Sequence, residues 1–205
     1  MKSKMNRRTF AKTIAAATLG VLSGCRSSNQ FNIIIKNGMI IDGTGHKAFQ
    51  SDIGIIGDKI AAIDDLKSAT AETIIDGEGF VISPGFIDIH THTALELIVN
   101  SNAESKLLQG VTTEVSGNCG DSLFPLSDVD FQEEDANTFE KYGFHINWRN
   151  IDGFLRILED QKISTNYVTF TGHGRLRSYV IGKNDVQATA EQLKDMKEVL
   201  TVAGR

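Results

Sequence analysis

Short apolar runs separated by turn-forming residues dominate the chain from residue 31 to residue 84. The breaks at Asn37-Gly38, Asp42-Gly43, Gly57-Asp58 and Asp76-Gly77 are typical of tight turns between antiparallel strands. The pattern therefore predicts a small all-β module over residues 31–84. Its expected strands are Phe31–Ile35, Met39–Ile41, Ile53–Ile56, Ile60–Ile63, Thr73–Ile75 and Phe80–Ile82.

The spacing of apolar residues changes after Pro84, where strand-like runs begin to alternate with helical patterns. Ile151, Phe154, Leu155 and Leu158, for example, fall on one face of a helix. Strands that alternate with helices indicate βαβ units and a parallel sheet, so residues 85–205 are predicted to form an α/β domain. The expected strands are Phe86–His92, Val111–Gly117 and Asn166–Thr171, and the expected helices are Ala103–Gln109, Ile151–Gln161 and Val186–Val202.

A long connection between Asp121 and Trp148 separates the second expected strand from the helix that follows it. It is rich in acidic residues, namely Asp128, Asp130, Glu133, Glu134 and Asp135. Long loops after strands often carry function in α/β enzymes, and a solvated connection without function is the alternative.

The first 25 residues have the pattern of an export signal. Five basic residues precede Gly24 with no acidic residue among them, and the apolar run Thr13–Gly24 is shorter than the roughly 20 residues of a spanning helix. Asn6–Lys12, with its Arg7-Arg8 pair, resembles a twin-arginine signal, and Leu22–Cys25 resembles a lipobox.

We therefore expect residues 1–24 to be a signal peptide, Cys25 to be the site of lipid attachment, and residues 25–30 to be a lipidated linker. The expected product is an exported lipoprotein, anchored to a membrane and facing the periplasm or the cell surface. The alternative for Arg7-Arg8 is a chance pair of charges beside an apolar N-terminal helix.

The charge balance excludes one class of partner. The chain has 21 Lys and Arg against 26 Asp and Glu, and without the predicted signal 16 basic residues face all 26 acidic ones. No basic run follows residue 25, so the sequence carries no electrostatic footprint for nucleic acid.

Two histidines close the apolar run that begins the α/β domain, within the sequence Pro84-Gly85-Phe86-Ile87-Asp88-Ile89-His90-Thr91-His92. On a strand, residues two apart share a face, so Asp88, His90 and His92 are expected on one side while Ile87 and Ile89 pack on the other. Two imidazoles at this spacing can hold one metal ion. The alternative is a polar strand end with two solvent-facing histidines.

These motifs resemble those of a known family. Gly85–His92 looks like the first-strand motif of the amidohydrolase superfamily, and Gln109–Gly120, which contains Asn118-Cys119-Gly120, is similar to the second-strand segment of its N-acyl-D-amino-acid deacylase (D-aminoacylase) branch. Gly172–Arg177 and Asn37–Gly45 also resemble segments of that branch. The resemblance implies an N-terminal β-sandwich segment, followed by the first three or so βα units of an incomplete (β/α)8 TIM barrel.

The resemblance also implies a zinc site. In the family a cysteine at the place of Cys119 helps to hold a tightly bound zinc ion, and the His-x-His pair, here His90 and His92, belongs to a second, weaker metal position. A thiolate is a strong zinc ligand, so zinc is the expected cofactor. The alternative for Cys119 is a buried, inert thiol.

Three residues of the third βα segment are candidates for contacts with substrate. His173 follows an expected strand and could face the substrate or form hydrogen bonds there, or be a structural histidine between two glycines. Arg175 and Arg177 could meet an acidic substrate, with solvated surface as the alternative.

The family resemblance implies zinc-dependent hydrolysis of N-acyl-D-amino acids by metal-activated water, with these small molecules as substrates. A complete barrel takes about 250 residues, whereas 121 run from Gly85 to Arg205. The other zinc ligands and the catalytic aspartate are therefore expected beyond Arg205, so no catalytic residue is assigned here. The chain alone is expected to be poorly stable and inactive.

Two other functions stay open on the sequence. One is a different amidohydrolase reaction, such as cyclic amide hydrolysis or the deamination of a ring, against which Asn118-Cys119-Gly120 argues. The other is a non-catalytic lipoprotein that retains a barrel remnant for binding.

Overall fold

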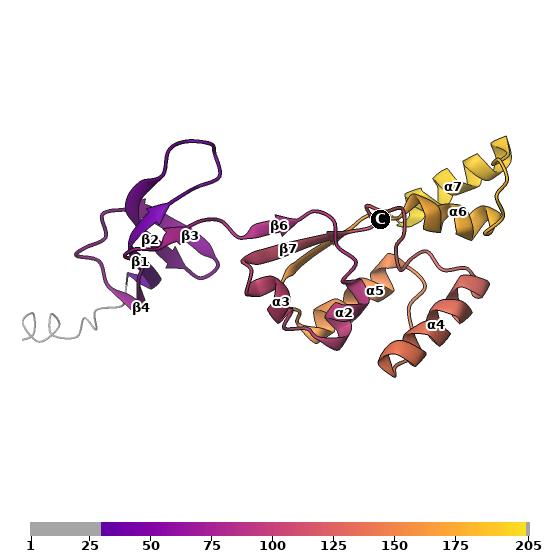
Figure 1. The fold of residues 1–205 in the computed structure, drawn as a ribbon, viewed down its shortest axis with the longest axis horizontal. Coiled ribbons are helices and arrows are strands. Elements are labelled where there is room, and N and C mark those ends of the chain that lie inside the picture. Colours follow the sequence, from indigo (N-terminus) through magenta and orange to yellow (C-terminus); the bar gives the residue numbers. More distant parts are fainter. Residues whose placement is uncertain (1–29, 204–205) are drawn as a thin grey trace, which may run out of the picture. The chain divides into compact units, whose positions relative to one another are not determined.

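A computed structural model describes residues 30–203 of the chain (Figure 1). The chain divides between Pro84 and Gly85 into two compact units, each described by itself below. The predicted signal peptide, Cys25 and all of the linker but Gln30 lie outside the described residues. Among residues 30–203, no helix is long and apolar enough to cross a membrane.

The first unit contains one mixed sheet of five strands, in which β1 is central. The order is β3-β2-β1-β4, and β5 also pairs with β1. β2 is antiparallel to β1 and β3, whereas β4 and β5 both run parallel to β1. The strands are β1 (Phe31–Ile40), β2 (Phe49–Ile56), β3 (Lys59–Asp64), β4 (Ala71–Asp76) and β5 (Val81–Ile82).

Two of the four predicted antiparallel turns are wrong. Asn37-Gly38 lies inside the single strand β1 as a bulge, where Asn37 has a φ of 61°. The buried carboxylate of Asp52 holds this bulge, because it accepts hydrogen bonds from the backbone N–H groups of Asn37 (2.8 Å) and Leu66 (3.0 Å). Asp76-Gly77 connects β4 and β5, which both lie parallel to β1, so this turn joins no antiparallel pair.

The second unit is built on a parallel sheet in the order β6-β7-β8, which confirms the predicted βαβ organisation. Its strands are β6 (Phe86–Asp88), β7 (Val111–Ser116) and β8 (Asn166–Thr169). Its helices are α2 (Ala94–Val99), α3 (Glu104–Leu107), α4 (Asp128–Tyr142), α5 (Ile151–Gln161), α6 (His173–Ile181) and α7 (Ala190–Ala203).

The acidic connection contains the helix α4, which the apolar pattern did not predict. The side chain of Ser127 caps the N-terminus of α4 by accepting a hydrogen bond from the backbone N–H of Asp130, and Gly143 ends the helix with a φ of 76°. Acidic residues in its first turn also stabilise a helix through the helix dipole.

The hydrophobic core of the second unit lies on one face of its sheet, where Figure 1 shows α2, α3 and α5. Phe154 of α5 is fully buried, and its ring centroid lies 5.4 Å from that of Trp148 and 6.0 Å from that of Phe124. The helical face predicted for residues 151–161 is therefore the face that packs into the core.

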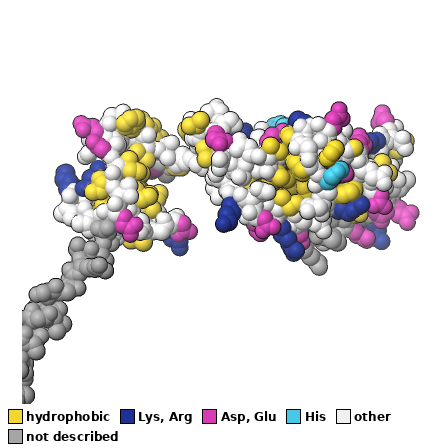
Figure 2. All heavy atoms as spheres, turned by 90° about the horizontal axis from the view of Figure 1, so that it is seen from below, with side chains coloured by type: hydrophobic (Ala, Val, Ile, Leu, Met, Phe, Trp, Pro, Cys, Tyr) yellow, Lys and Arg dark blue, Asp and Glu magenta, His cyan; other side chains and the backbone are white. Residues whose placement is uncertain are grey.

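The opposite face of this sheet is exposed, which makes the predicted packing of Ile87 and Ile89 wrong. Their side chains are 61% and 69% exposed, and Val168 and Phe170 are exposed as well. Figure 2, which is seen from below Figure 1, shows hydrophobic side chains at the surface of the second unit on the side of α2, α3 and α5 as well. In a closed barrel this face would form the interior, and no described residue of the second unit covers it.

Candidate metal centre

The two histidines and the cysteine lie just after the C-terminal ends of two neighbouring parallel strands. β6 ends at Asp88, so His90 and His92 belong to the following loop and not to the strand that the sequence predicts. β7 ends at Ser116, and Cys119 follows three residues later. Because β6 and β7 pair in parallel, both loops leave the same edge of the sheet.

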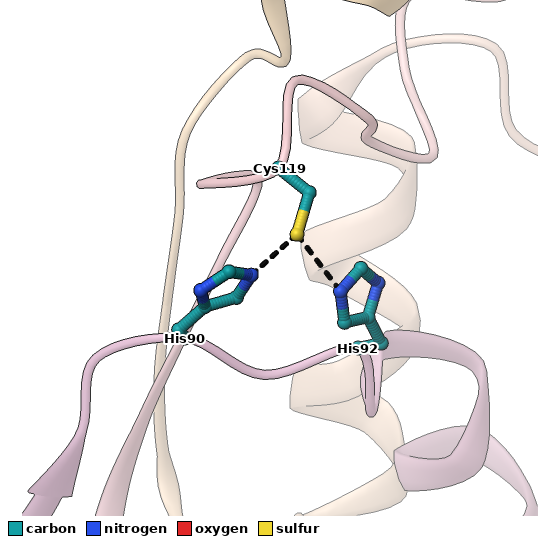
Figure 3. A group of neighbouring side chains, drawn as sticks. All are labelled: His90, His92 and Cys119. Atoms are coloured by element: carbon teal, nitrogen blue, oxygen red, sulfur yellow. Dashed lines mark hydrogen bonds between the residues drawn. The ribbon is translucent and has the colours of Figure 1, made fainter.

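The side chains of His90 and His92 converge on the sulfur of Cys119 (Figure 3). The Nε2 atom of His92 lies 3.0 Å from Sγ, the Nε2 atom of His90 is also in contact with Sγ, and the two ring centroids are 5.6 Å apart. One ligand atom from each residue lies within 4.8 Å of the other two, and all three residues are exposed.

This donor set fits a zinc ion. Zinc in proteins is held by thiolate sulfur at about 2.3 Å and by imidazole nitrogen at about 2.0–2.1 Å. Ligands of one tetrahedral ion are then roughly 3.5 Å apart, so the ring of His92 would move outward from Sγ by about half an ångström. Three protein ligands leave one tetrahedral position for a further ligand, and the exposure of the group makes that position accessible.

Close backbone packing places the loop that carries Cys119. Gly117 has a φ of 88°, which favours glycine, and Gly120 lies against the start of α6. A Cβ atom added at Gly172 would lie 2.5 Å from the carbonyl carbon of Gly120, so the two backbones can meet only because residue 172 is a glycine. The backbone N–H of Arg175 also donates to the carbonyl oxygen of Gly120 at 3.1 Å.

Asp88 does not join the histidines at the candidate metal centre. One of its carboxylate oxygens accepts a hydrogen bond from the backbone N–H of His90 (3.2 Å), and the other lies 2.6 Å from Nζ of Lys106. These hydrogen bonds, first that of Lys106 and then that of the His90 backbone, hold the pKa of Asp88 below its usual value. Lys106 was not a candidate on the sequence, because nothing in its local pattern indicates this contact.

A cavity of about 280 Å³ lies beside the candidate metal centre. His92 forms part of its wall, together with Leu95 of α2, Gly117 after β7, and Thr138 and Tyr142 of α4. Its volume is close to the lower end of the range for small-molecule sites. The helix α4, which the sequence pattern did not predict, therefore builds one wall of the cavity nearest to the metal centre.

The predicted substrate residue His173 is the first residue of α6 and is exposed. It follows Gly172, whose backbone packs on that of Gly120, so it lies close in space to the loop of Cys119. The structure does not test whether His173 contacts a substrate, so this role stays a prediction.

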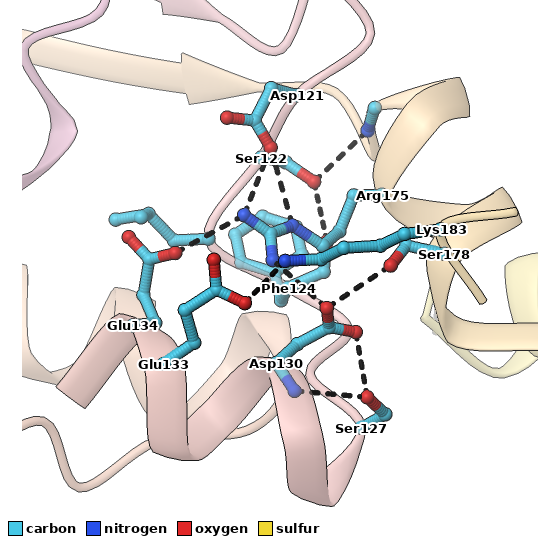
Figure 4. Close-up of polar contacts among 12 residues, drawn as sticks. Asp121, Ser122, Phe124, Ser127, Asp130, Glu133, Glu134, Arg175, Ser178 and Lys183 are labelled. Carbon is cyan, nitrogen blue, oxygen red and sulfur yellow. Dashed lines mark hydrogen bonds and ion pairs between the residues drawn. The ribbon is translucent and has the colours of Figure 1, made fainter. Parts of the chain in front are cut away.

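The structure overturns the solvated-surface alternative for Arg175, whereas its contact with an acidic substrate stays a prediction. Its side chain is only 11% exposed and forms ion pairs with Asp121 (3.0 Å), Glu134 (3.3 Å) and Asp130 (3.9 Å), as Figure 4 shows. Arg177 instead donates to backbone carbonyl oxygens, including that of Asn184 at 3.0 Å. Both arginines therefore stabilise the packing and the loops around α6.

No protein-family model matches the chain. Among curated proteins, the D-aminoacylase of Alcaligenes xylosoxydans xylosoxydans is 34% identical over 179 residues, which cover 84% of this chain and 35% of that enzyme. The chain therefore spans about a third of the length of this relative.

Solved structures give the same result for the fold. The N-acyl-D-glutamate deacylase from Bordetella bronchiseptica, solved with zinc and a phosphonate inhibitor that mimics the tetrahedral intermediate, matches with a TM-score of 0.74 at 29% identity. The match covers 85% of this chain and 36% of that one. A D-aminoacylase described as defining a novel subset of amidohydrolases matches with a TM-score of 0.72 at 34% identity, over 84% of this chain and 36% of that one.

Proposed function

The chain belongs to the N-acyl-D-amino-acid deacylase family of the amidohydrolase superfamily, and on that premise we propose that it is part of a zinc-dependent hydrolase of N-acyl-D-amino acids. Because it spans about a third of its relatives' length, this activity is proposed for the whole protein. The observation that carries the proposal is the convergence of His90, His92 and Cys119 at the edge of a parallel sheet.

In this proposal the three side chains form part of the metal cradle. A zinc ion bound there would polarise the substrate carbonyl and lower the pKa of a bound water toward 7. His90 and His92 contribute neutral nitrogen donors, and Cys119 contributes an anionic sulfur that must lose its proton to bind. The cavity beside His92 is wide enough for part of a small acyl amino acid, with His173 proposed to face the substrate.

Zinc binding by the 205-residue chain tests the metal cradle. We expect the purified chain to retain zinc on dialysis and Cys119→Ser to bind it at least ~10-fold more weakly, because a thiolate is lost. The other cysteine offers a matched control, since Cys25→Ser removes a thiol that is not part of this group. A wild-type chain without zinc affinity, or equal affinity in both variants, would contradict the proposal.

The activity of the chain by itself is a separate question. Because the catalytic aspartate and further zinc ligands are expected beyond Arg205, we propose that the zinc-loaded 205-residue chain does not hydrolyse N-acetyl-D-amino acids. Release of free D-amino acid by the purified chain, abolished by Cys119→Ser, would show that the residues present suffice.

Export and anchoring complete the proposal. Arg7-Arg8, the short apolar run and Cys25 stand in the order of a twin-arginine lipoprotein signal, so the mature chain is proposed to begin with a lipidated Cys25 and to face the periplasm or the cell surface. Mass spectrometry of the chain extracted from membranes should find a lipid on Cys25. Cys25→Ser should leave the protein unlipidated, and an unmodified Cys25 in the wild-type protein would refute the anchor.

A further inference from the structure

The loop Asp88–Thr93 contains both histidines and is called the histidine loop below. From His90 to Thr93, its successive side chains alternate between two sets of partners. The side chains of His90 and His92 contact Cys119, whereas the hydroxyl groups of Thr91 and Thr93 contact the carboxylate of Glu114. Thr93 donates to Oε2 of Glu114 at short range, and Thr91 donates to the same oxygen at 3.5 Å. The loop is thus held on the side opposite to the one that presents its imidazoles.

Glu114 is an unusual residue for its position, because it lies in the middle of β7 with no exposed surface. A buried carboxylate is costly unless it is paired and hydrogen-bonded. Here Thr165 donates a hydrogen bond to Oε1 of Glu114 at 3.0 Å, and the threonines of the histidine loop donate to Oε2. Nζ of Lys106 lies 3.9 Å from the same Oε2 atom. An apolar residue would pack at this place without such partners, but it could not hold the hydroxyl groups.

Lys106 connects the same network to the first histidine. Its Nζ lies 2.6 Å from Oδ2 of Asp88 and donates to Oγ1 of Thr91 at 3.3 Å. The other oxygen of Asp88 accepts the hydrogen bond from the backbone N–H of His90. The chain is therefore fixed just before His90, between the histidines, and just after His92.

We infer that Glu114 and Lys106 are positioning residues, which fix the loop Asp88–Thr93 so that both imidazoles meet the sulfur of Cys119. The rings themselves are exposed and receive little support from packing, so the backbone must set their position. Groups that orient metal ligands typically change metal affinity 10–100-fold when they are removed. The expected effect on zinc rests on the proposed metal cradle, whereas the effect on the loop does not.

Thr93 and Thr165 provide a matched pair of substitutions. Both donate a hydroxyl hydrogen bond to Glu114, but only Thr93 lies on the histidine loop. Thr93→Val should lower zinc affinity about 10–100-fold, whereas Thr165→Val should leave it within about 3-fold of wild type. In the metal-free chain, hydrogen exchange of the amides of residues 89–93 should become faster in Thr93→Val and stay unchanged in Thr165→Val.

The two readouts separate the possible failures. Equal hydrogen exchange of the loop in both variants would overturn the positioning role, whatever the zinc affinity. Faster exchange in Thr93→Val together with no zinc binding by the wild-type chain would support the positioning role and refute the metal cradle. If Thr93→Val does not fold, Thr93→Ser and Thr93→Ala replace it, and the serine variant, which keeps the hydroxyl, should behave as wild type.

Discussion

Replacing Arg175 with methionine should remove the main electrostatic link between α6 and α4. The guanidinium group is 11% exposed and lies between Asp121, Asp130 and Glu134 (Figure 4). Methionine preserves most of the aliphatic volume of arginine, so the substitution tests the charge more than the packing. Asp130 is the partner most affected, because its side chain is only 2% exposed.

The cost follows from the burial of each partner. For unit charges 3.9 Å apart, Coulomb's law gives about 4 kcal/mol at an effective dielectric constant of about 20. Asp121 is 69% exposed, so water screens its pair to below ~1 kcal/mol. Asp130 keeps its hydrogen bonds from the hydroxyl groups of Ser127 and Ser178. Arg175→Met should therefore lower the free energy of unfolding by about 3 kcal/mol, in the range found when one partner of a buried pair is removed.

Urea unfolding followed by tryptophan fluorescence measures this cost. Trp148 is the single tryptophan of the chain, and it is 3% exposed in the core of the second unit, so its emission reports on the unit that contains Arg175. In an Asp130→Asn background the buried carboxylate is gone, and Arg175→Met should then cost only about 1 kcal/mol. An equal cost in both backgrounds would refute the assignment of the energy to the Arg175–Asp130 pair.

Three further outcomes are expected. Burial raises the pKa of Asp130, but hydrogen bonds from Ser127 and Ser178 and the charge of Arg175 outweigh it and leave the pKa below its usual value. A carboxyl group with a lowered pKa stabilises the fold above its unfolded pKa of about 3.9, and the contribution is lost as pH falls below that value. Acid unfolding followed by circular dichroism should therefore begin at higher pH in Ser178→Ala, and an unchanged midpoint would contradict this. Gly172→Ala should displace the loop of Cys119, because the added Cβ would lie 2.5 Å from the backbone of Gly120. Zinc affinity should fall, and unchanged affinity would show that the loop adapts. His92→Ala should lower zinc affinity whereas His145→Ala, which removes an exposed imidazole paired with Asp135, should not; equal effects would count against the candidate centre.

Local patterns predicted those elements whose stability is local. The helix α5 begins at Ile151 and ends at Gln161, as expected, because its apolar face is continuous and Asn150 caps it by accepting a hydrogen bond from the backbone N–H of Gly153 at 2.9 Å. The strands β7 and β8 begin at the expected residues, since both are rich in the β-branched and aromatic residues that favour strands.

The elements that were missed depend on partners far along the chain. The helix α4 has no continuous apolar stripe, and it is held to the α6 region by Arg175 and by an ion pair between Glu133 and Lys183. The strand expected over Phe86–His92 ends at Asp88, because the threonines that follow turn toward Glu114. Neither the ion pairs nor the hydroxyl contacts leave a periodic signal in the sequence.

The candidate centre shows the same division between local and non-local information. The His-x-His spacing and the Asn-Cys-Gly segment identify its three side chains, because each motif is short and lies directly after a strand. Glu114 belongs to no motif, and in the sequence it is the one acidic residue in a run of valine, threonine and serine. Its role depends on the register that pairs Asp88 with Glu114 and Glu114 with Tyr167. A shift of β7 by one residue would turn the carboxylate to the opposite face of the sheet, away from Thr91, Thr93 and Thr165. The placement of the histidines therefore depends on strand register as much as on the motif that contains them.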